Sequence, residues 1–467
     1  MIFNSWAYVV FLPLVLLLYW PLPWRGRLYL LLVANAVFYG WWDARFLILI
    51  ALSIGIDFIA GQRIGRLERS DPARKRWLAL SACANLGILG VFKYFDFFSQ
   101  STVVLLSAIG LETDPLLLRV ILPIGISFYT FQSMAYTIDV YRGKIEPVYD
   151  LVVFANYVSF FPQLVAGPIE RAGNLVPQLQ QLRTGRDCEI QRGLFLILWG
   201  MYKKVVVADN LARIVSVCLD AENPTAGGVV VGNLAFAFQI YCDFSGYTDI
   251  ARGSALLLGV RLRENFKLPY FAISPSDFWT RWHVSLSSWL RDYLYISLGG
   301  NRRGKYLTYR NLCLTMLLGG LWHGAAWTFI IWGAYHGLLL IIYRLVFGSG
   351  GHPPAKSVLG RGFWMLVMFI FTLGGWAIFR ASSLDQLVGF VQAMVQFDWQ
   401  APAGSLRDTV FLSSGVVVMM VVQAWREDMM VAFRSPILVR MPLAILLVGL
   451  IVMLGATGGT EFIYFQF

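Results

Sequence analysis

Two histidines in strongly apolar surroundings are the residues with the clearest chemical potential. His323 and His336 interrupt the run from Leu312 to Phe347, which is otherwise largely apolar. An imidazole at membrane depth has to face a bundle interior or a watery cavity, so it marks a candidate functional site. Imidazole is also the side chain that most often transfers protons in catalysis. We therefore expect acid–base chemistry here, and His323 is the stronger candidate.

The local sequence separates His323 from the other histidines. Small residues remove side-chain bulk on both sides of its ring, namely Gly319, Gly320, Gly324, Ala325 and Ala326. A small substrate therefore has room to reach this ring. For His336 and His283, a buried ring that hydrogen-bonds a backbone carbonyl is an equal alternative. On one continuous helix His323 and His336 would point to nearly opposite faces, so we expect no metal site shared by them.

His283 lies in a charged and aromatic stretch that begins at Phe278. Arginines alternate there with tryptophans, which predicts an amphipathic helix at the membrane interface. A glycine turn at residues 299–300 follows, and the basic cluster after it is Arg302, Arg303, Lys305 and Arg310. This cluster suits the phosphates of coenzyme A or an acidic carrier protein. The usual excess of basic residues in cytoplasmic loops explains it equally well.

The segment QIYCDFSGYTD, residues 239–249, places two carboxylates in apolar helical sequence. Charges in such a setting need partners. We expect a polar hinge between two helices, and direct catalysis by a carboxylate is the alternative. Asp243 is also able to orient His323 or His283, as in a carboxylate–histidine pair.

The composition is that of a membrane protein. The 467 residues are 58% hydrophobic and 14% charged, and the mean hydropathy is +0.63. These values predict an all-α polytopic membrane protein with about ten to twelve crossings. The expected spans include Trp6–Leu22, Leu28–Tyr39, Phe46–Ala60, Trp77–Phe92, Phe363–Phe379, Thr409–Trp425 and Met441–Leu454. Pro123, Pro162 and Pro168 interrupt apolar sequence, so the segments around them are expected to enter the membrane without crossing it.

The charge distribution predicts the topology. The loop Gly61–Arg76 is strongly basic and therefore cytoplasmic, whereas the first residues carry no Lys or Arg. The first apolar run is expected to be a retained helix, with both chain termini outside the cytoplasm. The net charge of +11 is spread over many loops, which favours lipid headgroups over nucleic acid. The five cysteines show no ligand spacing, so we expect neither a metal site nor a disulfide.

Three common classes of enzyme lose their usual support. The chain has no GxSxG elbow and no HExxH motif, and the glycine stretch GGNRRGK at residues 299–305 is followed by Tyr306 where a phosphate-binding P-loop needs Ser or Thr. Acyl transfer from a thioester to a hydroxyl remains, and it needs a base for the hydroxyl and donors for the oxyanion. The main alternative is a transporter or flippase, which usually has two halves with matching interrupted segments. No such internal symmetry is visible.

Several blocks between Leu122 and Phe467 resemble the membrane-bound O-acyltransferase family. They are LPIGISFYTFQSMAYTIDVYRG, FFPQLVAGPIER, QIYCDFSGYTDIARG, ENFKLPY, PSDFWTRWHVSLSSWLRDYLYISLGGNRRG, LTMLLGGLWHGAAWTFIIWGAYHG and FIYFQF. The blocks look most like the bacterial branch that acetylates alginate and cellulose and helps to D-alanylate teichoic acids. The resemblance covers most of the chain.

This resemblance implies one transmembrane domain over residues 1–467, with helices, re-entrant segments and interfacial helices around a central tunnel. In the family, the histidine of GLWHG is catalytic and the histidine of RWH is its companion. These roles fall on His323 and His283. We expect further substrate contacts from Trp322, Asp243, Arg302 and Arg303.

The resemblance also implies substrates and partners. The donor would be acetyl-coenzyme A or another acyl thioester in the cytosol, with no bound cofactor. The expected partner is a periplasmic SGNH-type acetyltransferase or a related polysaccharide-modifying protein, and the expected location is the bacterial inner membrane. Residues 461–467 resemble an aromatic C-terminal motif whose tyrosine, here Tyr464, is proposed as a transient acyl carrier. Composition alone favours an interfacial aromatic belt for these residues.

Overall fold

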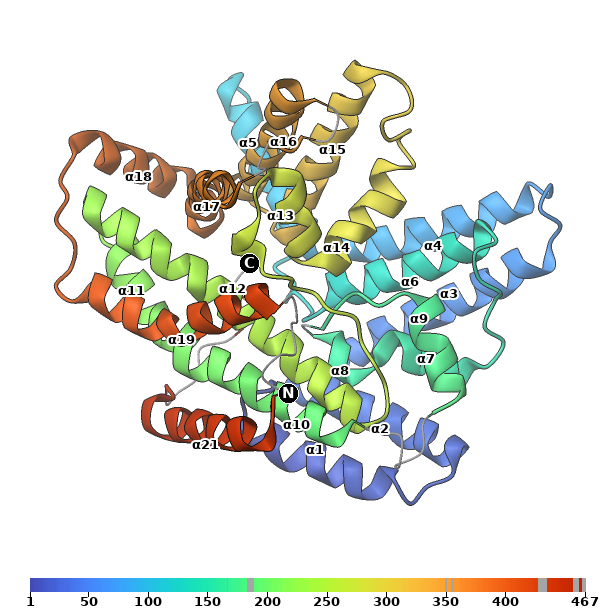
Figure 1. The fold of residues 1–467 in the computed structure, drawn as a ribbon. Coiled ribbons are helices and arrows are strands. Elements are labelled where there is room, and N and C mark those ends of the chain that lie inside the picture. Colours follow the sequence, from blue (N-terminus) through green and yellow to red (C-terminus); the bar gives the residue numbers. More distant parts are fainter. Residues whose placement is uncertain are drawn as a thin grey trace. The chain divides into compact units, whose positions relative to one another are not determined.

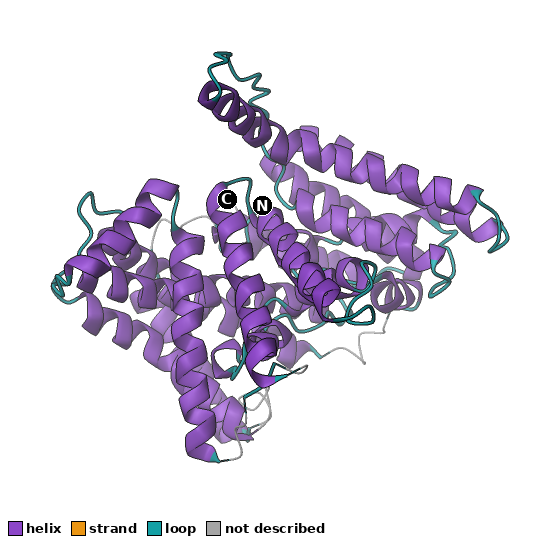
Figure 2. Cartoon of the chain, turned by 90° about the horizontal axis from the view of Figure 1, so that it is seen from above, coloured by secondary structure: helices purple, strands orange, loops and turns teal. Residues whose placement is uncertain are grey.

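The chain folds into helices joined by short connections. The computed structural model describes residues 1–165, 167–182, 189–348, 351–353, 357–426, 435–456 and 462–463. Within these residues every regular element is a helix, as Figure 2 shows. Seven of the described helical segments are long and apolar enough to cross a membrane. The prediction of an all-α, multi-pass membrane protein is therefore confirmed.

The chain divides into two compact units, and Figure 1 labels their α-helices. The first unit contains residues 1–190 and 254–263. Its helices are α1 (Trp6–Tyr19), α2 (Trp24–Asp43), η1 (Ala44–Phe46), α3 (Leu47–Arg66), α4 (Ala73–Leu89), η2 (Gly90–Tyr94), α5 (Phe95–Ala108), α6 (Ile126–Tyr141), α7 (Leu151–Ser159), α8 (Phe161–Leu164) and α9 (Ala172–Gln180).

A buried polar network joins α3 and α4 inside the first unit. Asp57 on α3 accepts hydrogen bonds from Ser81 Oγ at 2.5 Å and from Asn85 Nδ2 at 2.9 Å, both on α4. Helices in lipid gain little from hydrophobic association, so polar contacts of this kind help to hold them together. The network explains how an apolar segment such as Leu47–Arg66 can contain a carboxyl group.

The proline-containing segments interrupt the helices as predicted. Gly125 has a left-handed backbone with φ of 75°, and α6 begins directly after it. Further on, α7 has 9 residues, and α8, which contains Pro162, has 4. Each is too short to cross a hydrocarbon core of about 30 Å.

The second unit contains residues 191–253 and 264–467. Its helices are α10 (Ile190–Met201), η4 (Tyr202–Ala208), α11 (Asp209–Leu219), α12 (Ala226–Leu257), η5 (Pro269–Phe271), α13 (Pro275–Arg281), α14 (Val284–Trp289), η6 (Leu290–Tyr295), α15 (Lys305–His323), α16 (Trp327–Phe347), α17 (Val358–Arg380), α18 (Leu384–Gln396), α19 (Ser405–Arg426) and α21 (Ile437–Leu454). At the unit boundary, α10 begins in the first unit and α12 ends in it. All four histidines belong to this second unit.

Candidate active site

His323 is the last residue of α15, at the closed end of a tight helical hairpin. Residues 324–326 leave the helical conformation, and α16 starts at Trp327 and returns alongside α15 (Figure 1). Two glycines make this close approach possible, because a Cβ at Gly320 would overlap the carbonyl of Phe329 and one at Gly333 would overlap that of Met316. His323 and His336 therefore lie on two helices, and the geometry of one continuous helix does not apply to them.

His283 also lies at a break between helices. Its backbone is left-handed, with φ of 43°, and it separates α13 from α14. The prediction of a single interfacial helix in this stretch is therefore wrong. Trp282 and Trp289 are buried instead of facing lipid headgroups, because short helical pieces turn them into the unit. A left-handed non-glycine residue costs about 1–3 kcal/mol and occurs often at functional sites.

The fold brings the two candidate histidines together. The ring centroids of His283 and His323 are 6.4 Å apart. Trp322 lies near both, with centroid distances of 5.1 Å to His323 and 6.0 Å to His283. Trp332 and Phe379 contact His323 at 5.0 Å and 5.5 Å. Together with the indole of Trp322, the two imidazoles form one buried cluster, and of the two only His323 lines one of the cavities described below.

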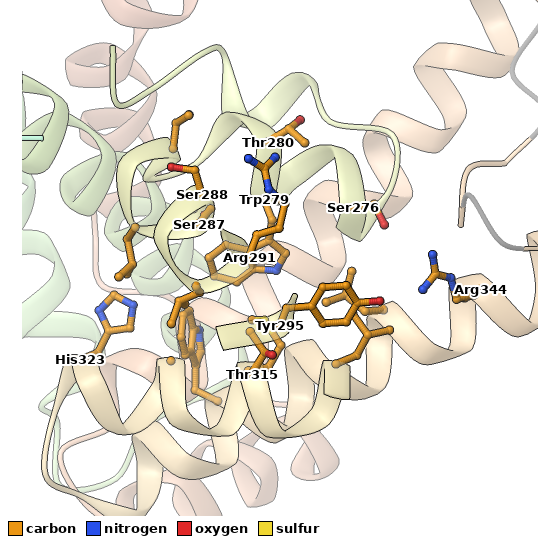
Figure 3. Close-up of a pocket in the computed structure, with 18 residues that line it drawn as sticks. Ser276, Trp279, Thr280, Ser287, Ser288, Arg291, Tyr295, Thr315, His323 and Arg344 are labelled. Atoms are coloured by element: carbon orange, nitrogen blue, oxygen red, sulfur yellow. The ribbon is translucent and has the colours of Figure 1, made fainter. Parts of the chain in front are cut away.

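A cavity of about 360 Å³ reaches His323. In Figure 3, His323 lies at one end of the labelled residues and Arg344 at the other, with Arg291 and Tyr295 between them. Arg344 follows Trp332 by about three helical turns of α16, which corresponds to about 18 Å along the helix axis. The cavity is therefore elongated, with an imidazole at one end and a guanidinium at the other.

A second cavity of about 430 Å³ lies beside the hairpin turn. Ala325 and Ala326, which follow His323 after Gly324, line it together with Gln239 and Ile463. His323 lines the first cavity but not the second, and the two cavities share no lining residue. The end of α15 and the turn that follows it thus contribute to different cavities.

His336 is enclosed by aromatic rings. It stacks parallel to Phe278 at 6.1 Å and meets Trp279 and Trp332 edge-on at 5.1 Å and 4.8 Å. It is absent from the linings of both cavities described above. His283 is likewise absent from both linings, so the enclosing rings, and not this absence, favour a core role for His336.

Asp243 belongs to a buried ionic cluster rather than to a hinge. Helix α12 continues unbroken through it, so the predicted hinge is wrong. The ammonium of Lys204 lies 2.9 Å from Asp243 and 2.8 Å from Asp209, and it compensates the buried charge. Asp243 also accepts a hydrogen bond of 2.8 Å from the backbone N–H of Ile463. Neither histidine is among the contacts of Asp243 in the described part of the chain.

Two further predicted residues lie apart from the cavity at His323. Arg302 and Arg303 are exposed in the turn before α15 and line neither cavity. Tyr464 and Glu461 lie outside the described residues. The two residues between them, Phe462 and Ile463, are buried, and the ring of Phe462 packs on Tyr247 at 4.4 Å.

The contacts of His283 include a residue that the sequence reasoning did not single out. Nδ1 of His283 lies 3.2 Å from Oδ1 of Asn265, which belongs to the ENFKLPY block. His283 lies outside the candidate membrane spans, and burial lowers the pKa of its imidazole to about 3. The ring is therefore neutral at physiological pH. Only the presence of Asn265 in one of the motif blocks pointed to it, since 18 positions of sequence separate the two residues.

Comparison with known proteins gives a consistent result. The profile of the family described as MBOAT, membrane-bound O-acyltransferase family, matches residues 144–373. A protein named probable alginate O-acetylase from Pseudomonas aeruginosa is 44% identical, over 90% of this chain and 80% of its own length. The peptidoglycan O-acetyltransferase of Helicobacter pylori is 36% identical, over 85% of this chain and 80% of its own length.

A more distant relative is named for the transfer of a different acyl group. The teichoic acid D-alanyltransferase of Bacillus subtilis is 29% identical, over 47% of this chain and 58% of its own length. All three named relatives transfer an acyl group, and the helical architecture and the paired histidines described above suit that chemistry. The chain belongs to the membrane-bound O-acyltransferase family and is a multi-pass membrane O-acyltransferase.

Proposed function

We propose that this enzyme takes acetyl groups from a cytosolic thioester, such as acetyl-coenzyme A, for the O-acetylation of an exported polysaccharide. The observation that carries the proposal is the position of His323 at one end of a cavity that extends to Arg344, while a second cavity begins two residues further along the chain. Two of the relatives are named as acetyl-transferring enzymes of cell-envelope polymers, alginate and peptidoglycan. The proposed location is the bacterial inner membrane.

The first cavity suits the donor. Arg291 and Arg344 line it away from His323, and guanidinium groups pair well with phosphates such as those of coenzyme A. The exposed Arg302 and Arg303 lie just before the first residue of α15, and His323 lies at the other end of that helix. A thioester that enters from the basic side would therefore present its acyl carbon to the imidazole.

The chemistry requires one proton transfer to the base and one back. His323 takes the proton of the attacking hydroxyl as its oxygen bonds to the acyl carbon, and the imidazolium returns that proton to the departing thiolate. The oxyanion needs a donor. The indole N–H of Trp332 has no acceptor among the described residues, and its ring lines the cavity beside His323. We assign it as the oxyanion donor.

The second cavity suits the acceptor, and Tyr464 is the proposed first acceptor. Ile463, the residue before it, lines this cavity, and Asp243 holds the backbone of Ile463. Phe462 packs on Phe244 at 5.6 Å, and the other side of Phe244 meets His283 at 4.7 Å. The chain therefore reaches the neighbourhood of both histidines immediately before Tyr464. From Tyr464 the acetyl group would pass to a periplasmic SGNH-type acetyltransferase.

Incubation of the purified protein with radiolabelled acetyl-coenzyme A tests the proposed donor. We expect release of free coenzyme A and label on the protein, and neither with His323→Ala. A transporter or flippase without acyl-transfer chemistry would release no coenzyme A. If another thioester is consumed but acetyl-coenzyme A is not, the donor assignment is overturned.

Tyr464→Phe tests the carrier because it removes only the phenol oxygen. The expected result is loss of protein-bound label and of polymer acetylation in cells, at an unchanged amount of protein. Normal acetylation of the polymer by this variant would assign the aromatic residues to an interfacial belt instead. Tyr306→Phe is a matched control, because Tyr306 is highly exposed on α15 and lines neither cavity.

A further inference from the structure

Asn265 binds three consecutive residues around the left-handed turn at His283. Its backbone carbonyl accepts the N–H of Val284 at 2.9 Å. Its side-chain Oδ1 accepts the N–H of Ser285 at 3.0 Å and lies 3.2 Å from Nδ1 of His283. Asn265 is only 1% exposed, and His283 is fully buried. These bonds stabilise a backbone conformation that a histidine rarely adopts.

The N–H of Ser285 fixes the orientation of the Asn265 amide. A backbone N–H can only donate, so the atom that it meets has to be the carbonyl oxygen and not the NH₂ group. That oxygen can only accept, so a hydrogen on Nδ1 of His283 makes this the favourable contact, and the hydroxyl of Ser285, 3.5 Å from the same nitrogen, is able to accept from it as well. A neutral imidazole has a hydrogen on one nitrogen and a lone pair on the other.

We propose that Asn265 is a positioning residue that holds His283 in the Nδ1–H tautomer, in which Nε2 carries the lone pair. The proposal rests on the proposed role of His283 in acyl transfer. With this tautomer, Nε2 accepts a hydrogen bond from a hydroxyl group and cannot donate one to a carbonyl oxygen. His283 therefore orients the hydroxyl nucleophile, and His323, whose ring centre is 6.4 Å away, takes its proton.

The other side of Asn265 faces a separate polar space. Asn265 lines a cavity of about 50 Å³ together with Lys203, Asp249, Arg252 and Glu264. These four groups form ion pairs, including Lys203 with Asp249 at 2.7 Å and Arg252 with Glu264 at 3.0 Å, so their formal charges balance. Nδ2 of Asn265 has no acceptor among the described residues, and a cavity of this size holds a few water molecules. Both the oxygen and the nitrogen of the Asn265 amide can therefore form hydrogen bonds without rotation of the side chain.

Nitrogen NMR on protein labelled with ¹⁵N-histidine tests the proposal directly. The chain has only four histidines, so the signals of His283 can be assigned as those missing from His283→Ala. In the unsubstituted protein we expect a protonated Nδ1 and an unprotonated Nε2 for His283. A protonated Nε2 overturns the proposal. This measurement needs no activity and no variant of Asn265.

Two substitutions test the consequence for the reaction. Asn265→Ala removes the acceptor, so we expect a mixture of tautomers and a fall in kcat of about 10–100-fold, with KM for the thioester little changed. Asn233→Ala is the control, because Asn233 also loses one buried bond, to the carbonyl of Leu373, without contact to His283. An unchanged kcat in Asn265→Ala overturns the proposal.

Asn265→Asp keeps an acceptor and adds a negative charge next to the ring. A carboxylate stabilises the imidazolium, so it raises the pKa of His283, by about one to three units. Because the hydroxyl needs the neutral ring, activity would be lost as the pH falls through the raised pKa, and the acid limb of the kcat profile would move to higher pH. His323 and the four charged groups around the small cavity remain in place in this variant, and the new carboxylate lies beside those four groups as well.

The two ideas fail in different ways. If His283→Ala is fully active while His283 of the unsubstituted protein shows the Nδ1–H tautomer, the proposed role of His283 in acyl transfer is wrong. The conclusion that Asn265 sets this tautomer then still holds. If His283→Ala is inactive while Asn265→Ala and Asn265→Asp match the unsubstituted enzyme in kcat and pH profile, the positioning role is wrong.

Discussion

His323 and His336 occupy the same hairpin and have similar surroundings, yet only one is placed to meet a substrate. Both are buried, at 4% and 2% exposure, and both contact the same ring, that of Trp332. His323 ends α15, is followed by small residues and lines a cavity. His336 lies in the middle of α16, where rings and the backbone of α17 enclose it.

The comparison shows that apolar sequence and burial do not identify a catalytic histidine in a membrane. What differs is access. A helix end beside glycines leaves an open space next to the ring, whereas a position inside a packed helix leaves none. If access is decisive, substitutions at the two ends of this hairpin should have very different effects on acyl transfer.

The largest effect is expected from His323→Ala. The substitution removes the proposed general base, which typically contributes about 10²–10⁴-fold to the rate, so acyl transfer should fall by that factor. The protein should still insert and fold, because the side chain lost lies beside a cavity. Coenzyme A release by purified protein, compared at equal amounts of folded material, measures the effect. Near-normal release would remove His323 from the mechanism.

Trp332→Phe should give the next largest effect. Phenylalanine keeps an aromatic ring between the two histidines and removes the five-membered ring of the indole with its N–H, so the variant is compared at equal thermal stability. Removal of one oxyanion donor typically lowers kcat by about 10²–10³-fold, so we expect a loss near the lower value, with little change in KM. A loss confined to KM would show that the ring only shapes the cavity.

Gly320→Ala tests whether the hairpin geometry is needed to place His323. The added methyl group would overlap the carbonyl of Phe329, so α15 and α16 would have to separate. Overpacking of this kind costs about 1–3 kcal/mol, and the shift of His323 should lower activity as well. Gly337→Ala is the control, because its Cβ would meet Cys313 and Met316 only at an ordinary 3.4 Å. Equal thermal stability and activity in the two variants would contradict the requirement for close packing.

Much of the fold could be predicted because membrane spans depend on composition over whole segments. The apolar runs, the interruptions at Pro123 and Pro162, and the turn before α15 all follow from local chemistry. His323 also stood out because glycines and alanines surround it. The break at residues 324–326 was missed, since small residues are tolerated inside membrane helices and do not by themselves announce a turn.

The errors and omissions at the site concern contacts between distant segments. The sequence around Asp243 predicts a hinge because it shows no partner for the carboxylate. In the structure the ammonium of Lys204, from η4, lies next to this carboxylate and compensates its charge. Asn265 reaches His283 only because the chain between them folds back on itself. A local pattern specifies neither contact. Sequence reasoning therefore singled out the two imidazoles that the fold brings together and missed the residues that contact them.

The smallest effect is expected from His336→Phe, which completes the comparison. Phenylalanine has a similar shape, and the site already consists of aromatic rings, so the stacking on Phe278 and the edge contacts to Trp279 and Trp332 can be kept. A volume-conserving core substitution usually costs less than about 1.5 kcal/mol, so the melting temperature should move by only a few degrees. Coenzyme A release should stay close to that of the unsubstituted enzyme. A fall in kcat as large as that of His323→Ala, at equal thermal stability, would mean that the imidazole of His336 takes part in the reaction. The difference in access between the two histidines would then not explain their roles.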